Sequence, residues 1–356
     1  MSQRFKDLDF ISIYLWIFRA IILVLVIYGT VNKLFFGVGN TYTTKIWVDF
    51  FVSGLSQGSL YALIALGYTM VYGVLFMINF AHGEFFMSGA ITSTVLVATF
   101  LSASGFMDQQ PVLGLLLTMI AAVLTAIGVA LLTERIAYRP LRRAPRLVPL
   151  ITAIGASFFW QYFFRGLFGS ALIPFPVPDA LQGRWTIFGL EFLKTRLIVM
   201  ATALIALIVL YLFIQRTKTG KAIRAVAEDK DTAALMGINV DRTIAITFAV
   251  GAAMAGVAGV LWGLVFRQVH FFMGFSPGIK AFTAAVFGGI GSIPGAALGG
   301  LLLGVIEAVG PPLFLEGLGI SGAHQLKDVI AFTMLVLILI FRPQGLIGEK
   351  LAEKKA

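Results

Sequence analysis

The sequence contains no cysteine and few charged residues. None of its 356 residues is cysteine and 12% are charged, whereas 59% are apolar. The lack of cysteine excludes a disulfide framework and a thiolate metal site. So little charge in so apolar a chain excludes an ordinary soluble domain. We therefore predict an all-α polytopic membrane protein.

The sequence also lacks the motifs of an enzyme. Its three histidines (His82, His270 and His324) are far apart, so no metal centre is expected. The Gly220-Lys221 pair lacks the glycine spacing and the following Ser/Thr of a phosphate-binding loop. Neither a nucleophile elbow nor a His/carboxylate metal motif is present. We expect a chain that is not an enzyme and binds no cofactor itself.

Long apolar runs predict about nine to ten transmembrane segments, including broken or re-entrant helices. The predicted runs are 10–31, 47–76, 77–102, 112–133, 147–169, 197–214, 243–266, 281–310 with a break at 291–294, and 329–341. The first is longer than a signal-peptide core and no small-x-small cleavage site follows it, so we predict a retained span. Between the runs we expect a basic loop over 134–146 and a short loop over 267–280.

The distribution of Lys and Arg predicts the orientation. Seventeen of the 27 basic residues fall in the amino terminus, 134–146, 215–242 and the tail, if these lie on one side. Cytoplasmic loops carry such an excess, so we expect a cytoplasmic amino terminus, and the net charge of +10 needs no nucleic acid to explain it.

The longest polar interruption, 215–242, has the pattern of two short helices. Asp229 or Asp231 can cap the second helix, and Gly237 stands where a left-handed cap would end it. Its small side chains suit a helix that docks in a groove of a partner; the alternative is a solvated loop that only holds orientation. The residues expected at this contact are Ala225, Ala227, Glu228, Asp229, Ala233, Ala234, Leu235, Met236 and Gly237.

Two apolar segments, one in each half of the chain, are interrupted by glycine or polar residues. Paired breaks of this kind indicate a translocation path, because freed backbone groups must line a cavity. The candidate path residues are Asn79, His82, Glu84, Gly288, Gly289, Gly291 and Glu307. The alternatives are that His82 and Glu84 cap a helix start, that Glu307 is a neutral packing residue, and that the glycines serve packing.

Four stretches carry a resemblance to a known family. They are GLSQGSLYALIALGYTMVYGVLFMINFAHGEF (54–85), ERIAYRPLRRAPRLVPLITAIG (134–155), GKAIRAVAEDKDTAALMGINVDRTIAITFAVGAAMAGVAGVL (220–261) and KAFTAAVFGGIGSIPGAALGGLLLG (280–304). In order and spacing the chain resembles, over about 48–350, the LivH-type permeases of bacterial branched-chain amino acid ABC transporters. The start of the chain, 1–45, departs from that pattern.

The resemblance implies a membrane-spanning subunit of an ATP-driven importer in the bacterial inner membrane. It implies a permease domain over 46–350 with a coupling loop at 215–242, an extension with an extra span over 1–45, and a cytoplasmic tail at 351–356. It also implies a second related permease, two ABC ATPase subunits that hold ATP and magnesium, and a periplasmic substrate-binding protein. Permeases for amides, urea or other amino acids stay open as alternatives, as does a self-sufficient channel or secondary transporter.

Overall fold

The computed structural model describes residues 10–347, except 38, 40, 143, 146, 188 and 343. The polar start at 1–9 and the predicted tail at 351–356 lie outside the described residues. The chain forms two compact units. We call Leu55–Gly304 with Phe332–Ala356 the core unit, and Met1–Gly54 with Val305–Ala331 the terminal unit.

Within the described residues, nine helices are long and apolar enough to cross a membrane. They are Ile13–Phe35, Thr44–Leu75, His82–Ala103, Pro111–Leu141, Leu147–Phe168, Lys194–Arg216, Val240–Phe266, Ile293–Leu318 and Ala323–Phe341. Each overlaps one of the predicted apolar runs, and the predicted span at 10–31 forms a continuous helix. The all-α polytopic fold is therefore confirmed.

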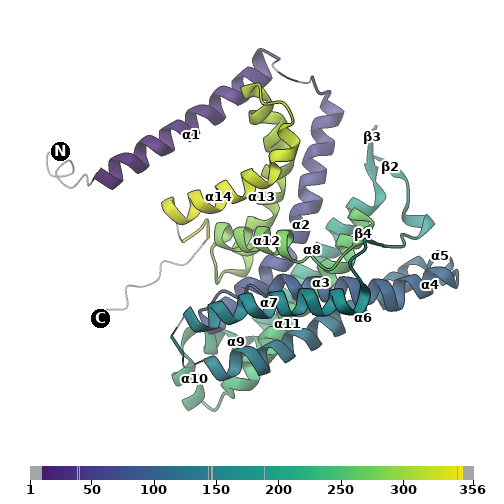
Figure 1. Cartoon of the computed structure of the whole chain (residues 1–356), viewed down its shortest axis with the longest axis vertical. Helices are drawn as coiled ribbons and strands as arrows, with labels where there is room; N and C mark the ends of the chain where they lie inside the picture. The colour runs from purple at the N-terminus through teal and green to yellow at the C-terminus, as the bar shows by residue number, and fades with distance from the viewer. Residues whose placement is uncertain are drawn as a thin grey trace. The chain divides into compact units, whose positions relative to one another are not determined.

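The α-helices and all strands except β1 are labelled in Figure 1. The helices are α1 (Phe10–Phe35), α2 (Thr44–Leu75), α3 (His82–Ser93), α4 (Thr99–Ala103), α5 (Phe106–Gln109), α6 (Pro111–Thr133), α7 (Leu147–Phe168), α8 (Lys194–Arg216), α9 (Lys218–Glu228), α10 (Lys230–Leu235), α11 (Val240–Phe266), α12 (Phe275–Gly288), α13 (Ile293–Gly310) and α14 (Lys327–Phe341). The strands form two antiparallel pairs, β1 (Ile173–Pro174) with β4 (Gln268–Val269) and β2 (Arg184–Ile187) with β3 (Leu190–Leu193).

Two predicted loops contain helix instead. After α6 the chain stays helical through a π-helical turn at Glu134–Tyr138 and a 3-10 turn at Arg139–Leu141. We call Pro111–Leu141 the α6 segment. Pro140 does not prevent this, because it stands in the first turn of a new helical segment, where no backbone N–H is needed. The predicted loop over 267–280 ends early, since α12 begins at Phe275 with Pro277 in its first turn.

The core unit is built on close contacts between helix backbones. Helices α3, α6 and α11 pack against one another. Gly89 of α3 and Gly256 of α11 both face Ala122 of α6, where an added Cβ would lie 2.8 Å from the Ala122 carbonyl oxygen. Such approach is open only to small residues, and it explains the glycine content of these helices.

The break predicted at 291–294 falls between Gly288 and Ile293. Gly289 and Gly291 take the left-handed φ values of 108° and 99° that turn α12 into α13. With 14 residues, α12 is too short to cross a bilayer, for which about 20 are needed. The chain after α14 returns to this turn, where Leu346 N–H donates to the Phe287 carbonyl and Ile347 N–H to that of Gly288.

The terminal unit joins α1 to the residues that follow α13. Gly29 and Gly317 meet backbone to backbone. Beside them a buried ion pair joins Lys33 Nζ to Glu316 Oε2 at 2.6 Å, and Tyr42 Oη donates to Glu316 Oε1 at 2.7 Å. Most other side chains of α1 are apolar and exposed, as expected of a helix that faces lipid.

Candidate functional site

A buried polar cluster lies at the start of α3 in the core unit. Asn79 orders the entry into this helix: its Oδ1 accepts from Ala81 N–H at 3.1 Å, and its carbonyl accepts from His82 N–H at 3.0 Å. The Tyr138 hydroxyl donates to the same Oδ1 at 2.6 Å. Asn79 therefore fixes both the helix start and its contact with the end of the α6 segment.

Glu84 is held by side chains of α7. Its Oε1 accepts from Ser157 Oγ at 3.0 Å and from Gln161 Nε2 at 2.7 Å. The sequence left open whether Glu84 and His82 cap a helix; the described residues give α3 no side-chain cap, and Asn79 accepts from the backbone of Ala81 just before it. Ser157 and Gln161 were missed, although polar residues four apart on an apolar helix share one face and could have signalled a polar partner.

His82 lies among aromatic rings. Its centroid is 4.8 Å from that of Tyr68 and 5.5 Å from that of Phe85. The Tyr68 ring continues to Phe282, and Phe282 to Phe80, each at 5.9 Å. The cluster thus combines one carboxylate and a few hydrogen-bonding groups with an aromatic wall.

The structure does not bring all candidate path residues together. Gly288, Gly289 and Gly291 lie at the carboxyl end of α12, whereas the Glu84 cluster lies at its amino end. A 14-residue helix separates these ends by about 20 Å. Gly288 serves packing, because an added Cβ would lie 1.8 Å from the Gly295 carbonyl oxygen. Glu307 is buried and belongs to the terminal unit.

The polar loop between α8 and α11 folds into α9 and α10. Thr217 Oγ1 accepts from Gly220 N–H at 3.0 Å and caps α9. Asp229 Oδ1 accepts from Asp231 N–H at 2.9 Å and from Thr232 N–H at 3.1 Å, so the predicted cap of the second helix is confirmed. Gly237 has the predicted left-handed conformation, with a φ of 83°.

The exposure of the predicted contact residues in this loop differs from the prediction at one position. Ala233 is buried with Ile223 and Val226 against the rest of the chain, so it is not free to meet a partner. Ala225 and Ala227 are half-buried, and Glu228, Asp229, Ala234 and Gly237 are exposed. The most exposed large apolar side chains here are Leu235 and Met236, at 88% and 79%. We call Ala234–Gly237 the loop tip.

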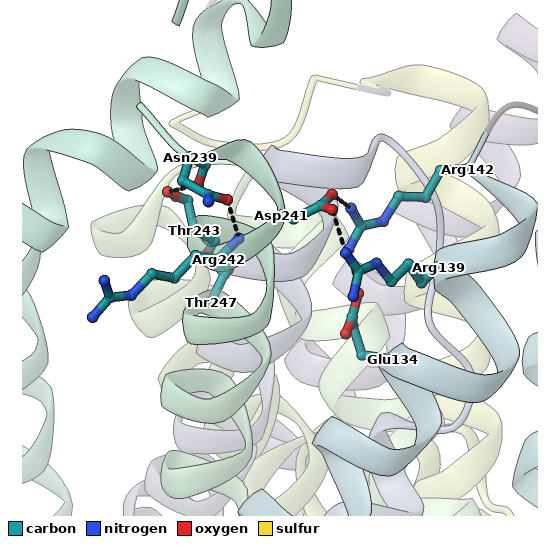
Figure 2. Close-up of polar contacts among 8 residues, drawn as sticks. All are labelled: Glu134, Arg139, Arg142, Asn239, Asp241, Arg242, Thr243 and Thr247. Atoms are coloured by element: carbon teal, nitrogen blue, oxygen red, sulfur yellow. Dashed lines mark hydrogen bonds and ion pairs between the residues drawn. The ribbon is translucent and has the colours of Figure 1, made fainter. Parts of the chain in front are cut away.

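An ionic cluster ties the beginning of α11 to the end of the α6 segment. Asp241 binds Arg139 at 2.5 Å and also Arg142, and Arg142 binds the buried Glu134 (Figure 2). Asn239 Oδ1 accepts from Arg242 N–H and caps α11 one turn away. This cluster has no signal in the local sequence, because 102 residues separate Arg139 from Asp241.

Lys230, at the start of α10, adds a contact with the end of α2. Its Nζ lies 5.7 Å from the centroid of the Phe76 ring. Partial burial, and then the charge of Arg142, lower the pKa of the Lys230 ammonium below its ordinary value. The loop thus has contacts with three helix ends: those of α2, the α6 segment and α11.

Comparison with known proteins places these features in a family. A model of the family described as "Branched-chain amino acid transport system / permease component" matches residues 50–339. The high-affinity branched-chain amino acid transport permease BraD of Pseudomonas aeruginosa is 44% identical over 85% of this chain and 96% of its own length. The permease LivH of Escherichia coli K12 is 41% identical over the same shares. LivH of Methanocaldococcus jannaschii is 27% identical over 82% of this chain and 89% of its own length.

Proposed function

Because this chain belongs to the family of permease components of branched-chain amino acid transport systems, we propose that it forms the membrane path of an ATP-driven importer for branched-chain amino acids. Separate subunits hydrolyse ATP and drive the path through the loop between α8 and α11. The nine membrane-length helices in the described residues supply the multi-pass body that such a role needs.

The observation that carries this proposal is a continuous series of contacts between the loop tip and the buried cluster. Gly237 and Asn239 join the tip to α11 without a flexible linker. Asp241 then binds Arg139 and Arg142 at the end of the α6 segment. Tyr138, next to Arg139 in the chain, donates to Asn79 in front of α3. A displacement of the loop tip can therefore be transmitted through contacting residues to Glu84, which lies five residues after Asn79 in the chain.

The loop tip suits a protein partner better than bulk water. Leu235 and Met236 are two large apolar side chains with almost complete exposure, and Glu228 and Asp229, earlier in the same loop, are also exposed. Apolar anchors flanked by charge are common at protein–protein contacts. We assign this contact to an ABC ATPase subunit, with a second permease and a second ATPase subunit completing the importer.

The remaining parts of the proposal follow from charge and from the class of transport system. We assign the loop tip and the amino terminus to the cytoplasmic side of a bacterial inner membrane, because cytoplasmic loops carry an excess of Lys and Arg. The opposite side then receives the amino acid from a periplasmic binding protein. ATP and magnesium bind to the ATPase subunits, and this chain contributes the path and the coupling contact.

The test removes the apolar anchors while keeping the fold of the loop. Leu235→Ser with Met236→Ser should insert and fold normally, because both side chains are exposed. Uptake of leucine and co-purification with the ATPase subunits should fall about tenfold or more, since loss of a buried interface anchor costs about 2 kcal/mol. Lys221→Ala, at an exposed position on the same loop, is the control and should change neither. Full uptake and full stoichiometry of the double variant would overturn the coupling role.

A further inference from the structure

Two helix amino termini meet inside the core unit. Helix α3 begins at His82 and α12 begins at Phe275, and Gly83 touches Gly274 between them. A Cβ on Gly83 would lie 2.4 Å from the Gly274 carbonyl oxygen, and one on Gly274 would lie 2.6 Å from that of Gly83. The amino end of a helix carries about half a positive charge. The meeting point of two such ends therefore favours an anion.

Glu84 is at this meeting point and is only half satisfied. The residue is 1% exposed. Ser157 and Gln161 donate to its Oε1, whereas its Oε2 has no hydrogen-bond partner among the described residues. A Cβ built on Gly274, the residue before α12, would lie 2.7 Å from this Oε2, so the oxygen points at the start of α12. An unsatisfied carboxylate oxygen at this depth is costly, and exceptions of this kind indicate a functional group.

Resting on the proposed function, we propose that this junction, made of Gly83, Glu84 and Gly274, receives the charged head group of the amino acid substrate. Glu84 Oε2 accepts hydrogen bonds from the substrate ammonium. The amino ends of α3 and α12 face the substrate carboxylate, as helix termini do for anions elsewhere. The two charges of the zwitterion then meet two charges of opposite sign, so the head group can leave water within the membrane.

The surroundings suit the rest of a branched-chain amino acid. The aromatic side chains of Tyr68, Phe80 and Phe282 form a continuous wall beside His82. An aliphatic side chain gains free energy by leaving water for such a wall, and it needs no polar partner there. Only the head group requires specific polar partners: Glu84 accepts from its ammonium, and the helix amino ends face its carboxylate.

The junction is closed in this structure. Gly83 and Gly274 are in backbone contact, so the head group has room only after the start of α12 separates from α3. Glycine suits both states, because no side chain has to be displaced when the helices part or close. The contact between Gly83 and Gly274 closes the path, and it opens only when the ATPase subunits drive the transport cycle.

The competing explanation is that Glu84 merely stabilises two helix ends. Glu84→Gln separates the two roles, because glutamine has the same size and can still accept from Ser157 and Gln161. It removes the negative charge and puts an amide where the substrate ammonium would bind. The decisive readout compares leucine with 2-hydroxy-4-methylpentanoate, in which a hydroxyl replaces the ammonium.

Binding of both compounds is measured on the purified importer complex in lipid nanodiscs without the periplasmic protein. Glu84→Gln should weaken leucine binding about 30-fold, the loss expected when one partner of a buried charge pair is removed. Binding of the hydroxy acid should change by less than about threefold, since it makes no ammonium contact. Thr94→Val, which removes a buried hydroxyl bonded to the Ala90 carbonyl, is the control and should alter neither.

Uptake of leucine by the wild-type complex with its binding protein separates this inference from the proposed function. No uptake would defeat both. Two results would defeat the inference alone, provided that the wild-type complex takes up leucine. In the first, Glu84→Gln keeps its affinity for leucine. In the second, the variant loses affinity for leucine and for the hydroxy acid to the same extent. A wild-type complex that takes up leucine but binds none without the periplasmic protein would also overturn it.

Discussion

The two units each contain a buried carboxylate, and the two are held in opposite ways. Glu316 of the terminal unit binds a cation, Lys33, through one oxygen, and Tyr42 and His324 surround the other. Glu84 of the core unit has two neutral donors on one oxygen and, in the part of the chain that the structure describes, none on the other. A carboxylate with a cation and a donor on each oxygen is an anchor. A carboxylate with one free oxygen in a glycine-packed junction is available for a ligand.

The difference extends to the helices around each carboxylate. In the terminal unit the ionic anchor fixes α1, a helix that precedes the part of the chain matched by the family model. Beside Glu84 the close contact is between the backbones of Gly83 and Gly274, which can separate without breaking an ion pair. Among the described residues, Glu84 thus has no cationic anchor of the kind that Lys33 gives to Glu316.

The largest effect on stability is expected from breaking the ion pair between Lys33 and Glu316 in the terminal unit. Lys33→Met leaves Glu316 buried with no ammonium, and removing one partner of a buried pair costs about 3 kcal/mol. We expect α1 to become accessible to protease or to hydrogen exchange while leucine uptake stays normal. Adding Glu316→Gln should restore much of the protection, because the unpaired charge is then gone. Unchanged exchange in α1 of the single variant would contradict the anchoring role.

The ionic cluster of the core unit gives a smaller, graded effect. Arg142→Met leaves the buried Glu134 without its guanidinium and should cost about 2 kcal/mol of stability. Arg139→Met breaks only a contact in which both side chains are about half exposed, and should cost about 0.5 kcal/mol. Thermal unfolding in detergent measures both. Equal shifts of the unfolding temperature for the two variants would show that the burial of Glu134 does not determine the loss of stability.

Glycine contacts in the core unit can be tested with a pair of identical changes. Gly256→Ala puts a Cβ 2.8 Å from the Ala122 carbonyl oxygen and should destabilise by about 1–2 kcal/mol. Gly73→Ala, at a helical position with no atom within 4 Å of the added Cβ, should stabilise by about 0.5 kcal/mol because alanine favours helix. If both variants stabilise, the close packing of α11 on α6 is not what the structure indicates.

The sequence was sufficient for features that depend on local chemistry. Apolar runs predicted the spans because a bilayer demands about 20 apolar residues for each helix. The caps at Asp229 and Gly237 were predictable because each satisfies backbone groups within three residues. The break before Ile293 followed from glycines alone.

Features that depend on distant partners were not predictable from one sequence. Ala233 was expected on the outer face and is buried, since helix pattern alone does not tell which side α10 turns to the body. The helical segment 134–141 ends beside Arg139 and Arg142, which bind Asp241 of another helix, a partner that the local sequence does not reveal. Glu84 was a candidate from its position, but its free oxygen became visible only with Ser157, Gln161 and Gly274 in place.

The smallest expected effect concerns His270, which lies between α11 and α12 outside the membrane-spanning helices. Its Nδ1 accepts from Phe272 N–H at 3.2 Å, and its carbonyl accepts from Met273 N–H at 3.1 Å. Burial lowers the pKa of the imidazole below its ordinary value of 6.5. A protonated ring would also lose the bond to Phe272, because Nδ1 could no longer accept. The turn that leads to Gly274 and the start of α12 therefore favours neutral histidine.

The sign of the pH dependence follows from this pKa. Below pH 6.5 the unfolded chain binds a proton that the folded chain resists, so stability is complete above that pH and decreases as the pH falls toward the lower folded pKa. Because the ring is only about half buried, solvent screening limits the loss to about 0.5 kcal/mol. Thermal unfolding of the wild type and His270→Gln between pH 7.5 and pH 5, at about 0.15 M salt to screen surface charges, isolates the contribution. The variant should show a flatter profile than the wild type over this range. Parallel profiles would mean that His270 titrates alike in both states, and that acid does not loosen the start of α12.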